Sequence, residues 1–184
     1  MKLAVFAVLT ALLAFLSRSP LSVPGSHGFY RFFGWESMLA LLLLNFGGVG
    51  PWFADPFSPR QIISWVLLIG SLVPALLGGR ELLRRGAVSR ERADPSLFDF
   101  EKTTRLVTTG VYRWIRHPLY ASLLMLTWGV FWKRPSWIGC ALAATASAFL
   151  VATARAEESE SVRYFGDAYR DYRRATRMFI PRLF

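Results

Sequence analysis

The stretch PLYASLLMLTWGVFWKRPSWIGCALAATASAFLVATA, residues 118–154, decides the fold of this chain. It contains two apolar runs, residues 118–132 and 137–154, separated only by the four residues KRPS. Each run approaches the ~20 residues that a helix needs to cross a bilayer. Helices joined by so short a connection pack as antiparallel neighbours. The stretch therefore predicts a helical membrane hairpin whose two far ends lie side by side.

Three more apolar runs precede the hairpin, over residues 1–16, 35–52 and 61–77, and the last can continue to residue 85. The 184 residues are 53% hydrophobic, 15% aromatic and 18% charged, a composition typical of a polytopic membrane protein. Tryptophan, which is common at membrane interfaces, ends these runs at positions 35, 52, 132 and 137. We predict an all-α, integral membrane helical bundle of about five transmembrane helices.

The placement of positive charge predicts the orientation of the bundle. The formal net charge is +10, and 18 of the 22 lysines and arginines fall on one side of the predicted membrane. Basic residues distributed between apolar runs argue against a nucleic-acid-binding protein. The positive-inside rule places the N-terminus outside and the C-terminus in the cytoplasm. We expect an integral protein of a bacterial inner (plasma) membrane, with lipids as partners on its basic face.

One membrane domain is expected over residues 1–184. Residues 1–85 would form three N-terminal spans, residues 86–109 a cytoplasmic connector with a break at Asp94-Pro95, and residues 110–184 the C-terminal core. The first run has Lys2 and a short apolar stretch, as signal peptides do, but no small-residue cleavage pattern follows, which favours a retained helix.

The sequence also predicts the structure of two segments outside the apolar runs. Residues 17–31, SRSPLSVPGSHGFYR, are rich in Pro, Gly and Ser and predict a loop, with His27 at the interface. The tail beyond residue 157 repeats apolar residues at helical spacing, which predicts an amphipathic helix lying in the membrane interface. Its apolar positions are Val162, Phe165, Tyr169 and Tyr172. Gly166 interrupts this tail and can mark a turn.

Polar residues gather at the two far ends of the hairpin. The stretch GVYRWIRHPLY, residues 110–120, holds one of only two histidines in the chain, and Glu157 and Glu158 follow the second apolar run. The antiparallel hairpin is expected to bring Arg116 and His117 beside these glutamates. Charged groups close to a bilayer are usually paired or functional. We therefore predict a site here, capped by the tail and by the connector over residues 98–109.

Two segments then resemble a known family: LVTTGVYRWIRHPLYASLL, residues 106–124, and ARAEESESVRYFGDAYRDYRRATRMFIPRLF, residues 154–184. They are similar to the C-terminal core of the isoprenylcysteine carboxyl methyltransferase and phospholipid methyltransferase superfamily, in a short bacterial-type form. The shared pattern is matched at Gly110, Tyr112, Arg116, His117, Pro118, Tyr120, Glu157, Glu158, Phe165, Gly166, Tyr169, Tyr172, Ile180 and Pro181.

The resemblance implies S-adenosylmethionine as the methyl donor, S-adenosylhomocysteine as the product, and a lipophilic acceptor that arrives from the bilayer. The implied cofactor-binding residues are Gly110, Tyr112, Arg116, His117, Pro118, Tyr120, Glu157 and Glu158. Cations would hold the donor carboxylate, glutamates its ammonium or ribose, and tyrosines its adenosine or sulfonium. No metal site is predicted.

The chemical class of the acceptor stays open at this point. A carboxylate acceptor is already nucleophilic and would be positioned by Arg155. An amine or thiol acceptor must lose a proton, for which Glu158 or His117 is the candidate base. Arg155 and Glu158 are thus the predicted catalytic residues.

Two other classes of protein compete with a methyltransferase. Sterol-reductase-type membrane enzymes use NADPH and share a related Arg-His-Pro-x-Tyr core, but tend to continue with Gly-Glu where this chain has Ala121-Ser122. A non-catalytic membrane scaffold or lipid-binding protein is the other alternative. A soluble-type methyltransferase is disfavoured because no glycine-rich nucleotide-binding motif follows a strand.

Overall fold

The computed structural model describes residues 1–87 and 103–183, and within them the fold is helical, as predicted. An isolated parallel bridge pairs Ile115 with Arg177. The elements in chain order are α1 (Lys2–Leu16), α2 (Arg18–Leu21), α3 (His27–Asn45), α4 (Val49–Phe53), α5 (Pro59–Arg85), the 3-10 turn η2 (Gly110–Arg113), α6 (Pro118–Lys133), α7 (Trp137–Phe165) and α8 (Asp167–Ala175).

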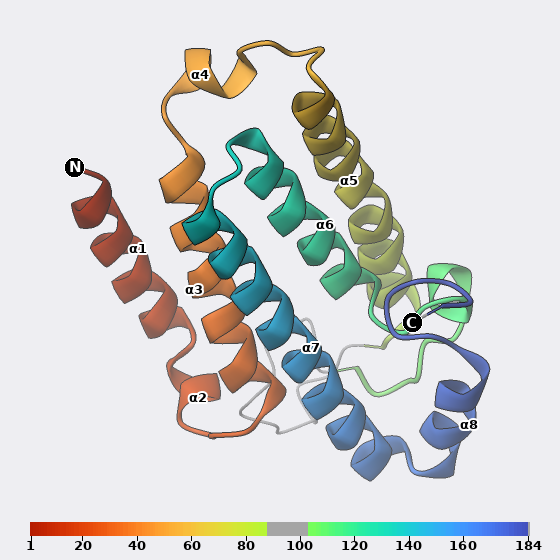
Figure 1. The fold of residues 1–184 in the computed structure, drawn as a ribbon. Coiled ribbons are helices and arrows are strands. Elements are labelled where there is room, and N and C mark those ends of the chain that lie inside the picture. The colour runs from red at the N-terminus through yellow and green to blue at the C-terminus, as the bar shows by residue number, and fades with distance from the viewer. Residues whose placement is uncertain (88–102, 184) are drawn as a thin grey trace.

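The five longer helices α1, α3, α5, α6 and α7 lie side by side and alternate in direction (Figure 1). Helices α6 and α7 are the predicted antiparallel hairpin, but α6 packs mainly on α5 and α7 mainly on α3. Among the described residues, α5 and α7 are long and apolar enough to cross a membrane, and α1 is a shorter apolar helix. We call the end where α6 begins and α7 ends the site end of the bundle.

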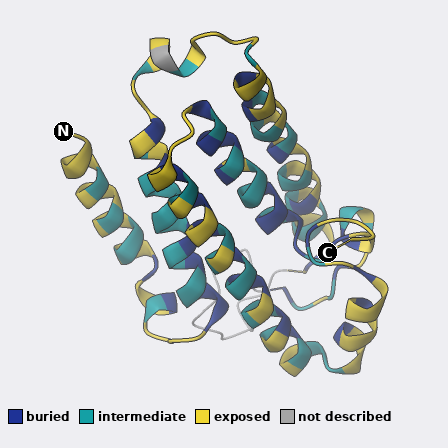
Figure 2. Ribbon diagram, viewed as in Figure 1, coloured by how far each residue is buried: buried dark blue, intermediate teal, exposed yellow. Residues whose placement is uncertain are grey.

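The pattern of burial fits a bundle with an apolar exterior. Outward-facing surfaces of α1 and α5 are largely exposed (Figure 2), and they carry many large hydrophobic side chains. Small residues fill the buried side of α7, including Ala143 and Ala146, both 0% exposed. A Cβ added to Gly34 of α3 would lie 3.6 Å from Phe149, so α3 approaches α7 closely. Close contact through small residues is how helices pair in lipid.

The apolar run over residues 35–52 forms a helix with other bounds than predicted. Helix α3 begins earlier, at His27, because the Ser26 hydroxyl caps it by accepting a hydrogen bond from the Phe29 N–H at 3.1 Å. It ends at Asn45, and Gly48 at φ 115° separates it from α4. The predicted loop over residues 17–31 was therefore wrong in part, since it contains α2 and the first turn of α3.

The last apolar run also continues further than predicted. Helix α7 does not end near residue 154 but runs to Phe165, because the polar residues that follow are good helix formers. The predicted tail helix is thus divided between α7 and α8 at Gly166. Tyr169 and Tyr172 are buried, while the arginines of α8 are exposed, as the spacing predicted.

Gly166 gives a first test of this division. Its φ of 61° and ψ of −133° suit glycine but strain any other residue. We expect Gly166→Ala to lower the free energy of unfolding by about 1–3 kcal/mol, measured by thermal unfolding in detergent. Gly79→Ala is the matched control, because Gly79 lies inside α5 with open space around it. Equal melting temperatures for both variants would contradict the assigned turn.

The connector is described only at its ends. The predicted break at Asp94-Pro95 and the Phe98 end of the predicted cap lie outside the described residues. The described end, from residue 103, returns to α5, where the Thr104 N–H donates to the Gly86 carbonyl at 3.1 Å. Thr103 and Val107 are buried there.

Candidate functional site

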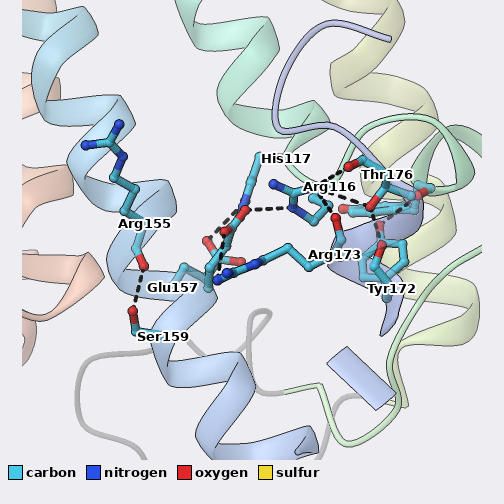
Figure 3. Close-up of polar contacts among 10 residues, drawn as sticks. Arg116, His117, Arg155, Glu157, Ser159, Tyr172, Arg173 and Thr176 are labelled. Carbon is cyan, nitrogen blue, oxygen red and sulfur yellow. Dashed lines mark hydrogen bonds and ion pairs between the residues drawn. The ribbon is translucent and has the colours of Figure 1, made fainter. Parts of the chain in front are cut away.

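The chain on either side of the site is held together by backbone pairing. The N–H of Arg116 donates to the Arg177 carbonyl at 2.8 Å, and that of His117 donates to the Met178 carbonyl at 3.1 Å. The Arg177 N–H in turn donates to the Trp114 carbonyl at 3.3 Å. The segment after α8 therefore runs alongside the segment before α6, and both lie against the last turns of α7 (Figure 3).

Arg116 joins three elements at this point. Its Nε donates to Oε1 of Glu158 on α7 at 2.7 Å. Its Nη1 donates to the carbonyls of Thr176 at 2.5 Å and Arg173 at 3.2 Å, at the end of α8. Carbonyls at a helix C-terminus lack partners within the helix and favour a cation. Arg116 therefore fixes α8 to α7, and it also lines the cavity.

Glu158 is a buried and compensated charge. It is 5% exposed, and besides Arg116 it contacts Nε2 of His117 at 3.3 Å and Nη1 of Arg173 at 3.8 Å. A carboxylate needs such partners to be buried at low cost. Because an ionised carboxylate only accepts, the contact favours a proton on Nε2 of His117 and leaves Nδ1 as an acceptor.

Glu157 and Glu160 differ from Glu158 because they line a cavity. The Glu157 side chain is 36% exposed, and its Oε2 lies 3.8 Å from Nδ1 of His117. Glu160 instead contacts His27 at the start of α3, with Oε2 2.5 Å from Nδ1 and Oε1 accepting the backbone N–H at 3.1 Å. Of these three carboxylates, Glu157 is the one best placed to receive a ligand.

The cavity is partly open to solvent. Its walls combine aromatic, apolar and charged side chains, among them Leu82, Leu106, Val107, Tyr112, Arg116, His117, Tyr120, Glu157, Glu160, Phe165 and Tyr169. His117 stacks on Tyr120, with ring centroids 5.5 Å apart. Tyr172 donates to the Tyr112 carbonyl at 2.7 Å. Burial raises the pKa of the Tyr112, Tyr169 and Tyr172 phenols, so they are neutral hydroxyls at physiological pH.

The structure brings most of the predicted site residues together and places three elsewhere. Those that line the cavity are Tyr112, Arg116, His117, Pro118, Tyr120 and Glu157. Glu158 lies behind this lining. Gly110 is not part of it either: at φ 60°, its Cα faces Glu81 so closely that a Cβ would lie 2.7 Å from Cδ of Glu81. Arg155 points away from Glu157 and His117 on α7 (Figure 3). It lines a separate, open groove with Tyr30.

Sequence reasoning missed several residues of the cavity. Glu160 and Ser161 were overlooked because the apolar run was taken to end before them, although both lie one turn after Glu157 on the same helical face. Leu82 and Thr103 come from α5 and from the connector. No spacing in the sequence relates them to the hairpin.

The comparisons with known proteins fit this site. Residues 91–168 match the model of the phospholipid methyltransferase family. This segment of the chain is similar to that family. It holds η2, α6, α7 and the glutamate cluster, and it confirms the methyltransferase resemblance predicted from the sequence.

Similar proteins share this part of the chain. A methanethiol S-methyltransferase 2 of Bradyrhizobium diazoefficiens is 35% identical over 77 residues, which are 42% of this chain and 29% of that protein. A methanethiol S-methyltransferase of Mycobacterium tuberculosis is 31% identical over 71 residues, 39% of this chain and 28% of that protein. The chain thus aligns with less than a third of these relatives. No solved structure matches the chain significantly.

Proposed function

We propose that this protein is an integral membrane methyltransferase that uses S-adenosylmethionine. In this proposal the five longer helices cross a bacterial inner membrane with the N-terminus outside. The site end then faces the cytoplasm, and α8 lies in the interface. Exposed apolar faces on α1 and α5 support the spans. The positive charge gathered beyond α5 and α7 supports the orientation.

One observation carries the proposal: a cavity with both charge signs and aromatic walls opens at one end of an apolar bundle. S-adenosylmethionine has a carboxylate, an ammonium, a ribose, an adenine and a sulfonium cation. The residues present fit these groups. Arg116 has donors for the carboxylate, Glu157 accepts from the ammonium or ribose, and Tyr112, Tyr120 and Tyr169 offer ring faces.

When bound, the methyl donor supplies an electrophilic methyl group whose transfer leaves a neutral thioether. The protein therefore needs no acid for the leaving group. Its residues align the acceptor with the methyl carbon in a site shielded from water. The described end of the connector, through Leu106 and Val107, covers part of the cavity and supports the predicted cap.

We propose a thiol as the acceptor class. Arg155, predicted to position a carboxylate acceptor, lies outside the cavity. A thiol must lose its proton, and His117, which lines the cavity, would accept that proton at Nδ1. Glu158 holds Nε2, and Glu157, 3.8 Å from Nδ1, stabilises the imidazolium that forms. The related proteins are named for a thiol, methanethiol.

The proposal is tested by titrating S-adenosylmethionine into the detergent-purified protein by calorimetry, with NADPH as the comparator. We expect binding of S-adenosylmethionine alone. The protein is then incubated with methyl-labelled donor and either methanethiol or a bacterial lipid extract. Label in the methylated thiol supports a thiol acceptor, and label in lipid would replace it with a lipid acceptor. Preference for NADPH, or binding of neither compound, would overturn the methyltransferase assignment.

A further inference from the structure

His27 and Glu160 form the longest-range polar contact to the cavity wall. They are separated by 133 positions, yet Nδ1 of His27 lies 2.5 Å from Oε2 of Glu160. His27 is 0% exposed, and the Glu160 side chain is 11% exposed. An ion pair this buried is not a solvated surface contact. Because Glu160 lines the cavity, this contact can influence what binds there.

The contact occupies both oxygens of Glu160. While Oε2 accepts from the imidazole, Oε1 accepts the backbone N–H of His27 at 3.1 Å. His27 is the first residue of α3, where backbone N–H groups lack helical partners and the helix dipole favours an anion. Glu160 is therefore held at the N-terminus of α3 and is not available to a cation in the cavity.

This arrangement affects Glu157, which lies one turn before Glu160 on the same face of α7. With Glu160 and Glu158 both engaged, Glu157 is the remaining carboxylate of the three for an ammonium or ribose. Without the His27 side chain, Glu160 would keep only the backbone N–H of residue 27, so Oε2 of Glu160 would be freed toward the cavity and the tie between α3 and the end of α7 would weaken. Both changes are expected to affect the binding of S-adenosylmethionine more than the proton transfer to His117.

We infer that His27 is a positioning residue of the methyl-donor site, acting through Glu160, so that α3 forms part of a site whose other charged residues come from the connector, at Arg105, and from the C-terminal core. The inference rests on the proposed function. His27 lies outside the segment matched to the family, residues 91–168. The sequence predicted His27 as an interfacial residue, and the structure buries its side chain completely within the bundle.

The test measures KM for S-adenosylmethionine and kcat in His27→Ala, His27→Asn and His27→Gln proteins. We expect His27→Ala to raise KM about tenfold, a loss of about 1.4 kcal/mol, with kcat changed less than about twofold. Asparagine places an amide N–H near the position of Nδ1 and should restore most of the affinity. Glutamine places its amide further along the side chain and should not. Ser37→Ala, on the same helix, is the control.

A double-mutant cycle with Glu160→Gln completes the test. If His27 acts through Glu160, adding His27→Ala to Glu160→Gln raises KM little further. Unchanged KM in folded His27→Ala protein, or additive effects in the cycle, would overturn the inference. Should His27→Ala fail to fold, the contrast between the asparagine and glutamine variants decides. Failure of the unmodified protein to bind S-adenosylmethionine would instead refute the proposed function.

Discussion

Arg116→Ala is expected to abolish binding of S-adenosylmethionine and to lower the free energy of unfolding by about 3–5 kcal/mol. The change leaves Glu158 buried without its nearest cation, 2.7 Å away. It also removes the bonds to the carbonyls of Thr176 and Arg173 that attach α8 to the rest of the site. The free energy is measured by chemical unfolding in detergent, and binding by calorimetry.

Arg113→Ala is the matched control, because Arg113 is exposed and contacts only the ring of its neighbour Trp114 among the described residues. We expect its stability and binding to stay close to those of the unmodified protein. Arg116→Lys protein should also be defective in binding and stability. The arginine guanidinium is a rigid fork whose separate N–H groups reach the carboxylate and the helix carbonyls together, whereas lysine has one ammonium group. Normal binding by Arg116→Ala protein would contradict the role assigned to this residue.

Glu157→Gln is expected to weaken binding of S-adenosylmethionine about 10–100-fold, the value of a hydrogen bond to a charged group. Its melting temperature should hardly change, because the side chain is 36% exposed and lies 3.8 Å from Nδ1 of His117, too far for a hydrogen bond. Calorimetry gives the affinity, and thermal unfolding gives the stability. A loss of affinity without a loss of stability distinguishes a ligand-binding carboxylate from a structural one.

Asp167→Asn provides the comparison for Glu157→Gln. Asp167 is an acidic residue of α8 with an 87% exposed side chain, and its ion pair with Arg170 is local to that helix. Its removal should leave both affinity and melting temperature unchanged. If Glu157→Gln binds as tightly as Asp167→Asn, the methyl donor is held by other residues.

The arrangement of the helical core could be predicted because the relevant signals are local. Apolar length, a four-residue connection and Pro118 at the start of a helix fix the hairpin of α6 and α7. Antiparallel geometry then places Arg116 and His117 beside Glu158, as the structure shows. The spacing of Tyr169 and Tyr172 likewise predicted their common buried face.

Other features depend on packing that the sequence does not encode locally. Arg155 precedes Glu157 by two residues, and a helix directs such residues to different faces, so its chemistry alone could not place it in the cavity. The engagement of Glu160 depends on where α3 begins, which was predicted several residues too late. Gly110 carries the family pattern, but Glu81 of α5 gives its steric reason.

Photo-crosslinking of labelled S-adenosylmethionine to the purified protein, followed by peptide mapping, tests the central claim most directly. The claim is that the cavity between the start of α6 and the end of α7 holds the methyl donor. We predict label on the peptides that carry Tyr112, Tyr120 or Tyr169, and loss of this label with excess S-adenosylhomocysteine or in Glu157→Gln protein. Label confined to α1, α3 or the Arg155 groove, or label that excess S-adenosylhomocysteine does not displace, would contradict the claim.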